Sequence, residues 1–224
     1  MDLRKLIIAA FVLSGMAALI YELVWIRPIQ FVLGSTIYTA SIIFAAFMAG
    51  LALGSFIISK YVDKIKNLPQ TYALLELGIG LYGVLLLLIF NQLPDLYRVI
   101  YTLHQTNFYI FEFIQFFLIF LVLLIPTTLM GATFPVIAKF YTKEKIGKGV
   151  GTIYSANNIG AIIGSFLAGF ILIPLLGIKL SIIFAALINI LIASSIILVV
   201  SKILFKKIIP ISIILFIILS SCPP

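Results

Sequence analysis

The sequence predicts an all-α integral membrane protein: a bundle of six transmembrane helices followed by a shorter seventh apolar segment. Of its 224 residues, 63% are apolar and 10% charged, with a mean hydropathy of +1.29. A water-soluble domain has about 45–50% apolar and about 25% charged residues. The apolar residues also form stretches as long as a bilayer crossing, about 20 residues. These observations exclude a water-soluble globular domain and leave no length for a separate enzyme domain.

Six apolar stretches are long enough to cross the membrane. A seventh, at 208–220, has about 13 residues and covers about 20 Å of a core about 30 Å thick, so we expect an interfacial, re-entrant or truncated segment. The chain therefore divides into a six-helix transmembrane domain, 1–207, and a short apolar C-terminal segment, 208–224. The predicted helices are 5–26, 34–59, 71–91, 108–137, 152–177 and 179–201.

The basic residues are distributed unequally between alternate connections. One set of connections carries twelve of them, and the other carries only Arg27, Arg98 and Lys179. The positive-inside rule then predicts a multi-pass protein of the inner (plasma) membrane with a cytoplasmic N-terminus. This topology explains the net charge of +8 better than nucleic-acid binding does. The segments expected in the cytoplasm are the N-terminus, 60–70, 139–150 and 202–207.

Three acidic residues, Glu22, Glu76 and Glu112, lie within or at the ends of the predicted spans, where a carboxylate needs a partner, water or a proton. Glu112 is beside the outer interface, and solvation there accounts for it. Glu22 is near the outer end of the first span, and Glu76 is one to two turns into the third. We expect Glu76 to meet an amide of the fifth span, either to fix helix register or to line a polar cavity. The polar residues available there are Tyr154, Asn157 and Asn158. No His, Cys or carboxylate cluster has metal-ligand spacing, so we expect no metal and no cofactor.

Small residues recur every four positions in the second and fifth spans, which places a smooth stripe along one face of each helix. Helix backbones approach closely at such stripes. We expect each stripe to pack against a neighbouring helix, against the other stripe, or against a second copy of the chain. The stripes consist of Ala46, Gly50 and Gly54, and of Ala156, Gly160, Gly164 and Ala168.

A short internal similarity links the starts of the same two spans. Residues 36–41 read Thr-Ile-Tyr-Thr-Ala-Ser, and residues 152–157 read Thr-Ile-Tyr-Ser-Ala-Asn. Because these two spans run in opposite directions, the similarity is the trace that a three-plus-three inverted repeat would leave.

The fourth span contains two prolines, Pro126 and Pro135, with threonines and a glycine between them. Proline removes a helical hydrogen bond, so we expect this segment to break the helix and free carbonyls for the threonines or a cavity. Between the third and fourth spans, we expect 92–107 to be a longer outward loop or a surface helix.

Five ordered segments resemble the membrane part of bacterial spermidine-synthase-like fusion proteins, whose helices are similar to half of a major facilitator transporter. The loop after the second span also resembles the major facilitator loop motif, with Asp63 and Lys64 at its acidic-basic pair and Ser59 where glycine is usual. The segments are LSGMAALIYELVW (13–25), FMAGLALGS (47–55), YALLELGIGLYG (72–83), PTTLMGATFPVIAK (126–139) and YSANNIGAIIGSFLAGFILIPLLG (154–177).

The resemblance implies a membrane module, but the glycine-rich nucleotide loop of an aminopropyltransferase is missing. We therefore expect a non-catalytic module that anchors or assists a partner protein on the cytoplasmic side. The alternative is a small transporter for an organic cation such as a polyamine, working as a homodimer, with carboxylates and aromatic rings as ligands. The aromatic candidates are Tyr21, Trp25, Tyr38, Tyr72 and Tyr154.

Overall fold

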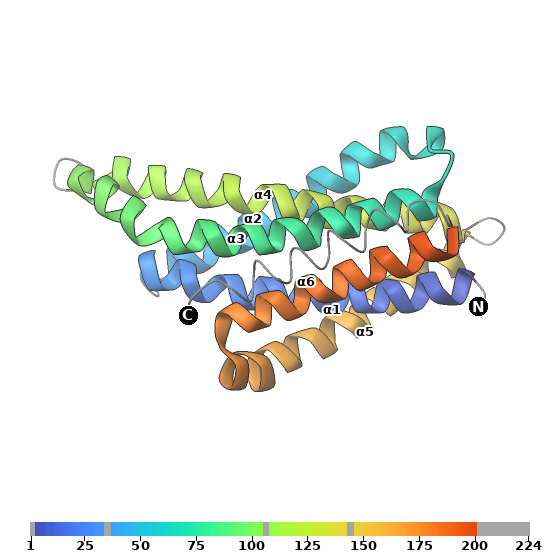
Figure 1. Cartoon of the computed structure of the whole chain (residues 1–224). Helices are drawn as coiled ribbons and strands as arrows, with labels where there is room; N and C mark the ends of the chain where they lie inside the picture. The colour runs from blue at the N-terminus through green and yellow to red at the C-terminus, as the bar shows by residue number, and fades with distance from the viewer. Residues whose placement is uncertain (1–2, 34–36, 105–107, 143–145, 201–224) are drawn as a thin grey trace.

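The computed structural model describes residues 3–33, 37–104, 108–142 and 146–200, which fold into six long α-helices with no strand among them (Figure 1). A 3₁₀ turn, η1 (Val62–Lys64), follows α2, and a π-helical turn, η2 (Ala168–Leu172), follows α5. The predicted segment 208–220 lies outside the described residues. The helices are α1 (Leu3–Leu33), α2 (Ile37–Tyr61), α3 (Leu68–His104), α4 (Phe108–Tyr141), α5 (Ile146–Leu167) and α6 (Ile173–Val200).

Five described stretches are long and apolar enough to cross a membrane, and the last of them, Gly147–Val200, has 54 residues. A straight helix of that length would measure about 80 Å, more than twice the membrane core. The chain instead reverses direction at Gly177, whose φ of 75° and ψ of 179° are not helical. This is the position at which the sequence predicted one helix to end and the next to begin.

Two predicted interruptions are absent from the structure. The segment 92–107, predicted as an outward loop or a separate surface helix, instead continues α3 without a break as far as His104, with Pro94 inside it. The fourth helix is also continuous, with Pro126 and Pro135 inside it. Each proline removes one backbone hydrogen-bond donor. The helices stay continuous because other groups, such as side chains, can donate to the carbonyls that lose this donor.

The pairing of the helices has an internal symmetry. Helix α2 packs mainly on α4, and α1 packs mainly on α5; α3 packs on α4, and α1 packs on α6; α3 and α6 pack on each other. Exchanging α1 with α4, α2 with α5 and α3 with α6 maps these pairings onto one another. This is the pattern expected of two three-helix repeats of opposite orientation.

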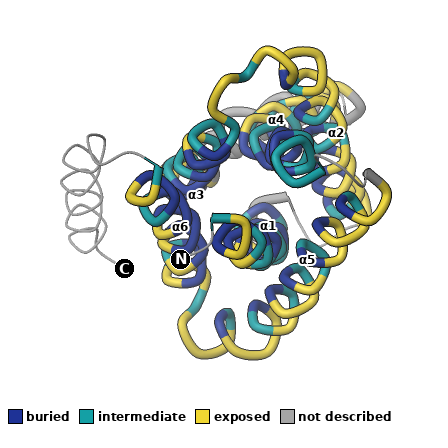
Figure 2. The backbone as a smooth tube through the Cα atoms, turned by 90° about the vertical axis from the view of Figure 1, so that its right-hand side faces the viewer, coloured by how far each residue is buried: buried dark blue, intermediate teal, exposed yellow. Residues whose placement is uncertain are grey.

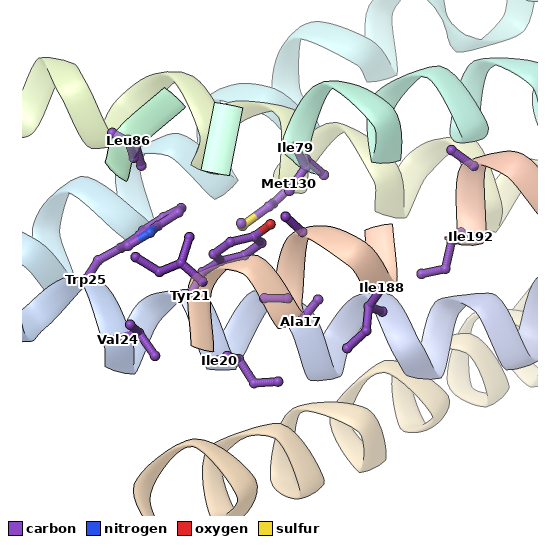
Figure 3. Close-up of a cluster of buried hydrophobic side chains, with 14 of the residues drawn as sticks. Ala17, Ile20, Tyr21, Val24, Trp25, Ile79, Leu86, Met130, Ile188 and Ile192 are labelled. Carbon is purple, nitrogen blue, oxygen red and sulfur yellow. The ribbon is translucent and has the colours of Figure 1, made fainter. Parts of the chain in front are cut away.

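Helix α1 is central in the bundle. It contacts each of the other five helices, and Figure 2 shows it enclosed by them. Its side chains Tyr21 and Trp25 stack with their rings 4.9 Å apart and are 0% and 1% exposed. Figure 3 shows them in a buried cluster that α3, α4 and α6 complete. The side chains of α1 that face this cluster are therefore positioned by contacts from several helices.

Candidate functional site

The centre of the bundle contains a carboxyl group that three helices surround. Glu76 on α3 is 0% exposed. The hydroxyl of Ser14 on α1 donates a hydrogen bond to Glu76 Oε1, and the amide of Asn189 on α6 donates one to Oε2, both at 2.6 Å. Glu76 therefore joins α1 and α6 through α3.

Further buried polar atoms lie around this carboxyl group. Tyr72, one turn before Glu76 on α3, and Tyr21 on α1 both interact with it electrostatically. Within the described part of the chain, four buried side-chain polar atoms have no hydrogen-bond partner, and three of them belong to this cluster: the two tyrosine hydroxyls and Asn189 Oδ1. The cluster thus has more hydrogen-bonding capacity than it uses.

No cation neutralises Glu76 among the described residues. The two ion pairs found there, Arg98 with Asp95 and Lys139 with Asp63, involve other carboxylates. The same residues contain no group of three or more His, Cys, Asp or Glu side chains that could hold a metal ion. Glu76 is therefore surrounded by polar but uncharged partners.

The amide partner of Glu76 differs from the one expected. The sequence favoured Asn157 or Asn158 of the fifth span, whereas the structure supplies Asn189 from α6. The reason is the helix pairing, because α3 packs on α6 and has no contact with α5. Asn157 and Asn158 are half-buried, and Asn157 lies against Gly15 of α1, where its side-chain and main-chain oxygens occupy the space of a Cβ.

Glu22 lies apart from the Glu76 cluster. It is 8% exposed, and no described residue forms a hydrogen bond or ion pair with it. At about 100° per residue, Glu22 falls between Trp25, about 60° away, and Gly15, about 20° away on the other side. Trp25 contacts Phe47 of α2 and Gly15 contacts α5. Glu22 therefore occupies the sector of α1 between α2 and α5, two helices that do not contact each other.

The two small-residue stripes pack against different neighbours. A Cβ at Gly50 or Gly54 would overlap Thr127 or Thr128 of α4, and Ala46 is fully buried beside them. A Cβ at Gly160 or Gly164 would overlap main-chain atoms of Val12 or Met16 on α1, and Ala168 is fully buried in η2. Both stripes are packing faces, and neither packs on the other.

Tyr154 is 59% exposed and meets Phe134 of α4 edge-on, with the ring centroids 6.3 Å apart. This contact joins α5 to α4 near the start of α5. The aromatic candidates therefore separate into two sets. Tyr21, Trp25 and Tyr72 are in the core, whereas Tyr154 and Tyr38 are exposed.

The loop between α2 and α3 is bound to α4 through Lys139. Lys139 Nζ donates to the Val62 carbonyl at 2.8 Å and pairs with Asp63 Oδ1 at 2.9 Å. Lys64, the other residue of the predicted loop motif, is exposed. The acidic residue of the motif thus has a structural contact, and that contact is to α4.

Sequence reasoning missed four contributors to these interactions: Ser14, Tyr82, Lys139 and Asn189. Asn189 had a signal, since it is an isolated amide in a long apolar stretch and amides in lipid hydrogen-bond across helices. Ser14 had a weaker one, because a serine can also hydrogen-bond within its own helix. The partner of Tyr82 and one of the two partners of Lys139 are main-chain carbonyls, which no residue pattern marks.

The comparisons with known proteins give one finding. The family model of the Major Facilitator Superfamily matches residues 6–207, nearly the whole described bundle. Neither the curated proteins nor the solved structures give a match. By the extent of the family match, the chain belongs to the Major Facilitator Superfamily.

Proposed function

We propose that this chain is one six-helix half of a major facilitator transporter and that it works with a second six-helix bundle, either another copy or a partner chain. Major facilitator transporters consist of two six-helix halves, each built from three-plus-three inverted repeats, and bind substrate near the midplane between them. The family match and the symmetric helix pairing support the assignment of this chain to one such half.

We propose six crossings with the N-terminus in the cytoplasm of the inner membrane. In Figure 1 the start of α1, the α2–α3 connection, the end of α4, the start of α5 and the end of α6 lie at one end of the bundle. Lys60, Lys64, Lys66 and Lys148 belong to that end. The positive-inside rule supports a cytoplasmic location for it.

The transport proposal rests mainly on the position of Glu22. A carboxyl group at membrane depth is expensive, and by default it marks a functional site. Glu22 has no partner within the described chain and lies on the sector of α1 between α2 and α5. A second bundle covering α2 and α5 would enclose that sector, and the carboxylate would then be available to a cationic substrate.

An organic cation such as a polyamine suits this arrangement. A carboxylate supplies charge, and an exposed tyrosine ring supplies a cation-π surface. Tyr38 and Tyr154, on α2 and α5, are exposed and could serve in this way, whereas Tyr21, Trp25 and Tyr72 are enclosed in the core.

Uptake of labelled spermidine into liposomes that contain the purified chain tests this proposal. We expect uptake by the native chain, loss of it in Glu22→Gln, and retention of it in Asp95→Asn, which removes an exposed carboxylate. Crosslinking should show a dimer. Absence of uptake by the native chain alone would refute transport by a homodimer, and full uptake by Glu22→Gln would refute the proposed role of Glu22.

One observation favours a second candidate function, a non-catalytic module that anchors a partner protein. Glu76, the more deeply buried carboxyl group, is enclosed by a hydroxyl and an amide inside the bundle and is not available to a solute. The resemblance to spermidine-synthase-like proteins would then indicate an aminopropyltransferase-like partner on the cytoplasmic side. Purification from native membranes in mild detergent distinguishes the two, because an anchor should retain a soluble nucleotide-binding protein in stoichiometric amount.

A further inference from the structure

The burial of Glu76 raises the question of whether its carboxyl group is ionised in the folded bundle. A charged group taken out of water into a membrane protein is stable only when a counter-charge or a dense shell of hydrogen bonds compensates for its lost hydration. Glu76 is 0% exposed and receives two hydrogen bonds, from Ser14 and Asn189, and no described cation lies against it. The carboxyl group is therefore neutral, accompanied by a cation, or charged and stabilised by these hydrogen bonds alone.

We propose that Glu76 is a proton-binding site, whose carboxyl group is neutral in the closed bundle and whose proton holds α1, α3 and α6 together. The bound ligand is a single proton on one carboxyl oxygen. Its release to water would leave a negative charge at the junction of the three helices.

The surrounding groups suit both protonation states. Asn189 Nδ2 donates a hydrogen bond to Glu76 Oε2, which suits a carboxylate. Asn189 Oδ1 is buried without a hydrogen bond. Because the oxygen and nitrogen of an amide can exchange places by a half-turn of the side chain, Oδ1 can instead accept the proton of a neutral carboxyl group at the same position. The hydroxyl of Ser14 can donate in either state.

A metal ion fits the same position less well. Both carboxyl oxygens are already at 2.6 Å from protein donors, one on each side. A sodium ion would need additional room beside these oxygens, in a position that is fully buried. A proton needs no such space.

Other titratable groups near Glu76 do not supply the missing charge. The group on α1 that interacts with it is Tyr21, and the one on α3 is Tyr72, and both are neutral at physiological pH. On α4, Lys139 is bound to Asp63 and the Val62 carbonyl. On α6, Lys179 is ten residues, about 15 Å, before Asn189.

Infrared spectroscopy of the full chain in lipid nanodiscs tests the proposal directly, because a protonated carboxyl group has a carbonyl absorption that a carboxylate lacks. At neutral pH we expect this absorption in the native chain and its loss in Glu76→Gln. Glu22→Gln and Asp63→Asn are the controls, and each should keep the Glu76 component. The spectra are recorded in sodium chloride and in choline chloride.

Two results would overturn the proposal. A carboxylate band from Glu76 at neutral pH that depends on sodium would indicate a sodium site. A carboxylate band indifferent to sodium would indicate a charged group stabilised by hydrogen bonds alone. Either result is distinguishable from misfolding because Glu76→Gln keeps the shape of the side chain, and circular dichroism of that variant reports its helix content.

Thermal unfolding provides a second, independent readout. A proton held by the folded bundle and released on unfolding makes stability fall as pH rises. An unfolded glutamate releases its proton at about pH 4.3, so the unfolding midpoint of the native chain should decrease as the pH rises from about 5 to about 7, whereas that of Glu76→Gln should decrease less. An identical pH dependence of the two proteins would refute the proposal.

Discussion

The hydroxyl of Tyr82 on α3 donates a hydrogen bond of 3.2 Å to the carbonyl of Val122 on α4. Val122 is four residues before Pro126, so its carbonyl is the one that loses its helical donor to the proline. The neighbouring carbonyls of Leu123 and Leu124 accept bonds from the hydroxyls of Thr127 and Thr128, at 2.7 and 2.6 Å. Side-chain donors thus surround the proline and keep α4 continuous.

Tyr82→Phe should destabilise the bundle by about 1 kcal/mol, because the Val122 carbonyl then has no donor in a medium without water. Unfolding of the purified chain in mixed detergent micelles measures this change. Pro126→Ala restores the backbone donor, so Tyr82→Phe should cost much less in the Pro126→Ala background. Equal costs in the two backgrounds would show that the tyrosine acts only through its packing.

Gly160→Ala should destabilise the bundle by about 1–3 kcal/mol, the cost of overpacking a tight interface. The new methyl group would overlap the carbonyl oxygen of Val12 on α1, which is main chain and cannot rotate away. The matched control is Gly151→Ala on the same helix, where no atom lies within 4 Å and alanine favours the helix. If both substitutions left the unfolding free energy unchanged, the α1–α5 contact would not contribute to stability.

The helices were predictable from sequence because lipid demands long apolar runs, and Gly177 lies at the predicted boundary of two of them. The ends of α3 and the continuity of α4 were not predictable. A proline predicts one lost hydrogen bond, but whether the helix breaks depends on a donor such as Tyr82, which lies forty residues away.

The candidate site was predictable in part. Glu76 was identifiable because a carboxyl group in a membrane span must have a partner. That partner, Asn189, depends on which helices are neighbours, and hydrophobic periodicity carries no such information when helices are apolar on all sides. The small-residue stripes similarly predicted close packing, while the choice of α1 for Gly160 and α4 for Gly50 required the structure.

Lys139→Met should loosen the connection between α2 and α3 more than Asp63→Asn does. The side chain of Asp63 is 87% exposed, so its ion pair contributes about 0.2–1 kcal/mol and weakens in salt. Lys139 also donates to the carbonyl of Val62, a buried residue, and its loss leaves that carbonyl without this donor. Hydrogen exchange of the amides of residues 62–68 measures the difference. Faster exchange in Asp63→Asn than in Lys139→Met would contradict this ranking.

Gly177→Ala should destabilise the bundle by about 1–3 kcal/mol through backbone strain and not through a steric clash. No atom lies within 4 Å of the position that a Cβ would take, but φ is 75° and ψ is 179°, a region that only glycine occupies readily. Gly169→Ala is the control, since its surroundings are equally open and its φ is negative. Because the strain arises where the chain reverses between α5 and α6, it should raise hydrogen exchange at 173–181 before it affects α1. Equal unfolding free energies for the two variants would mean that the reversal tolerates a side chain and that the glycine is not what fixes it.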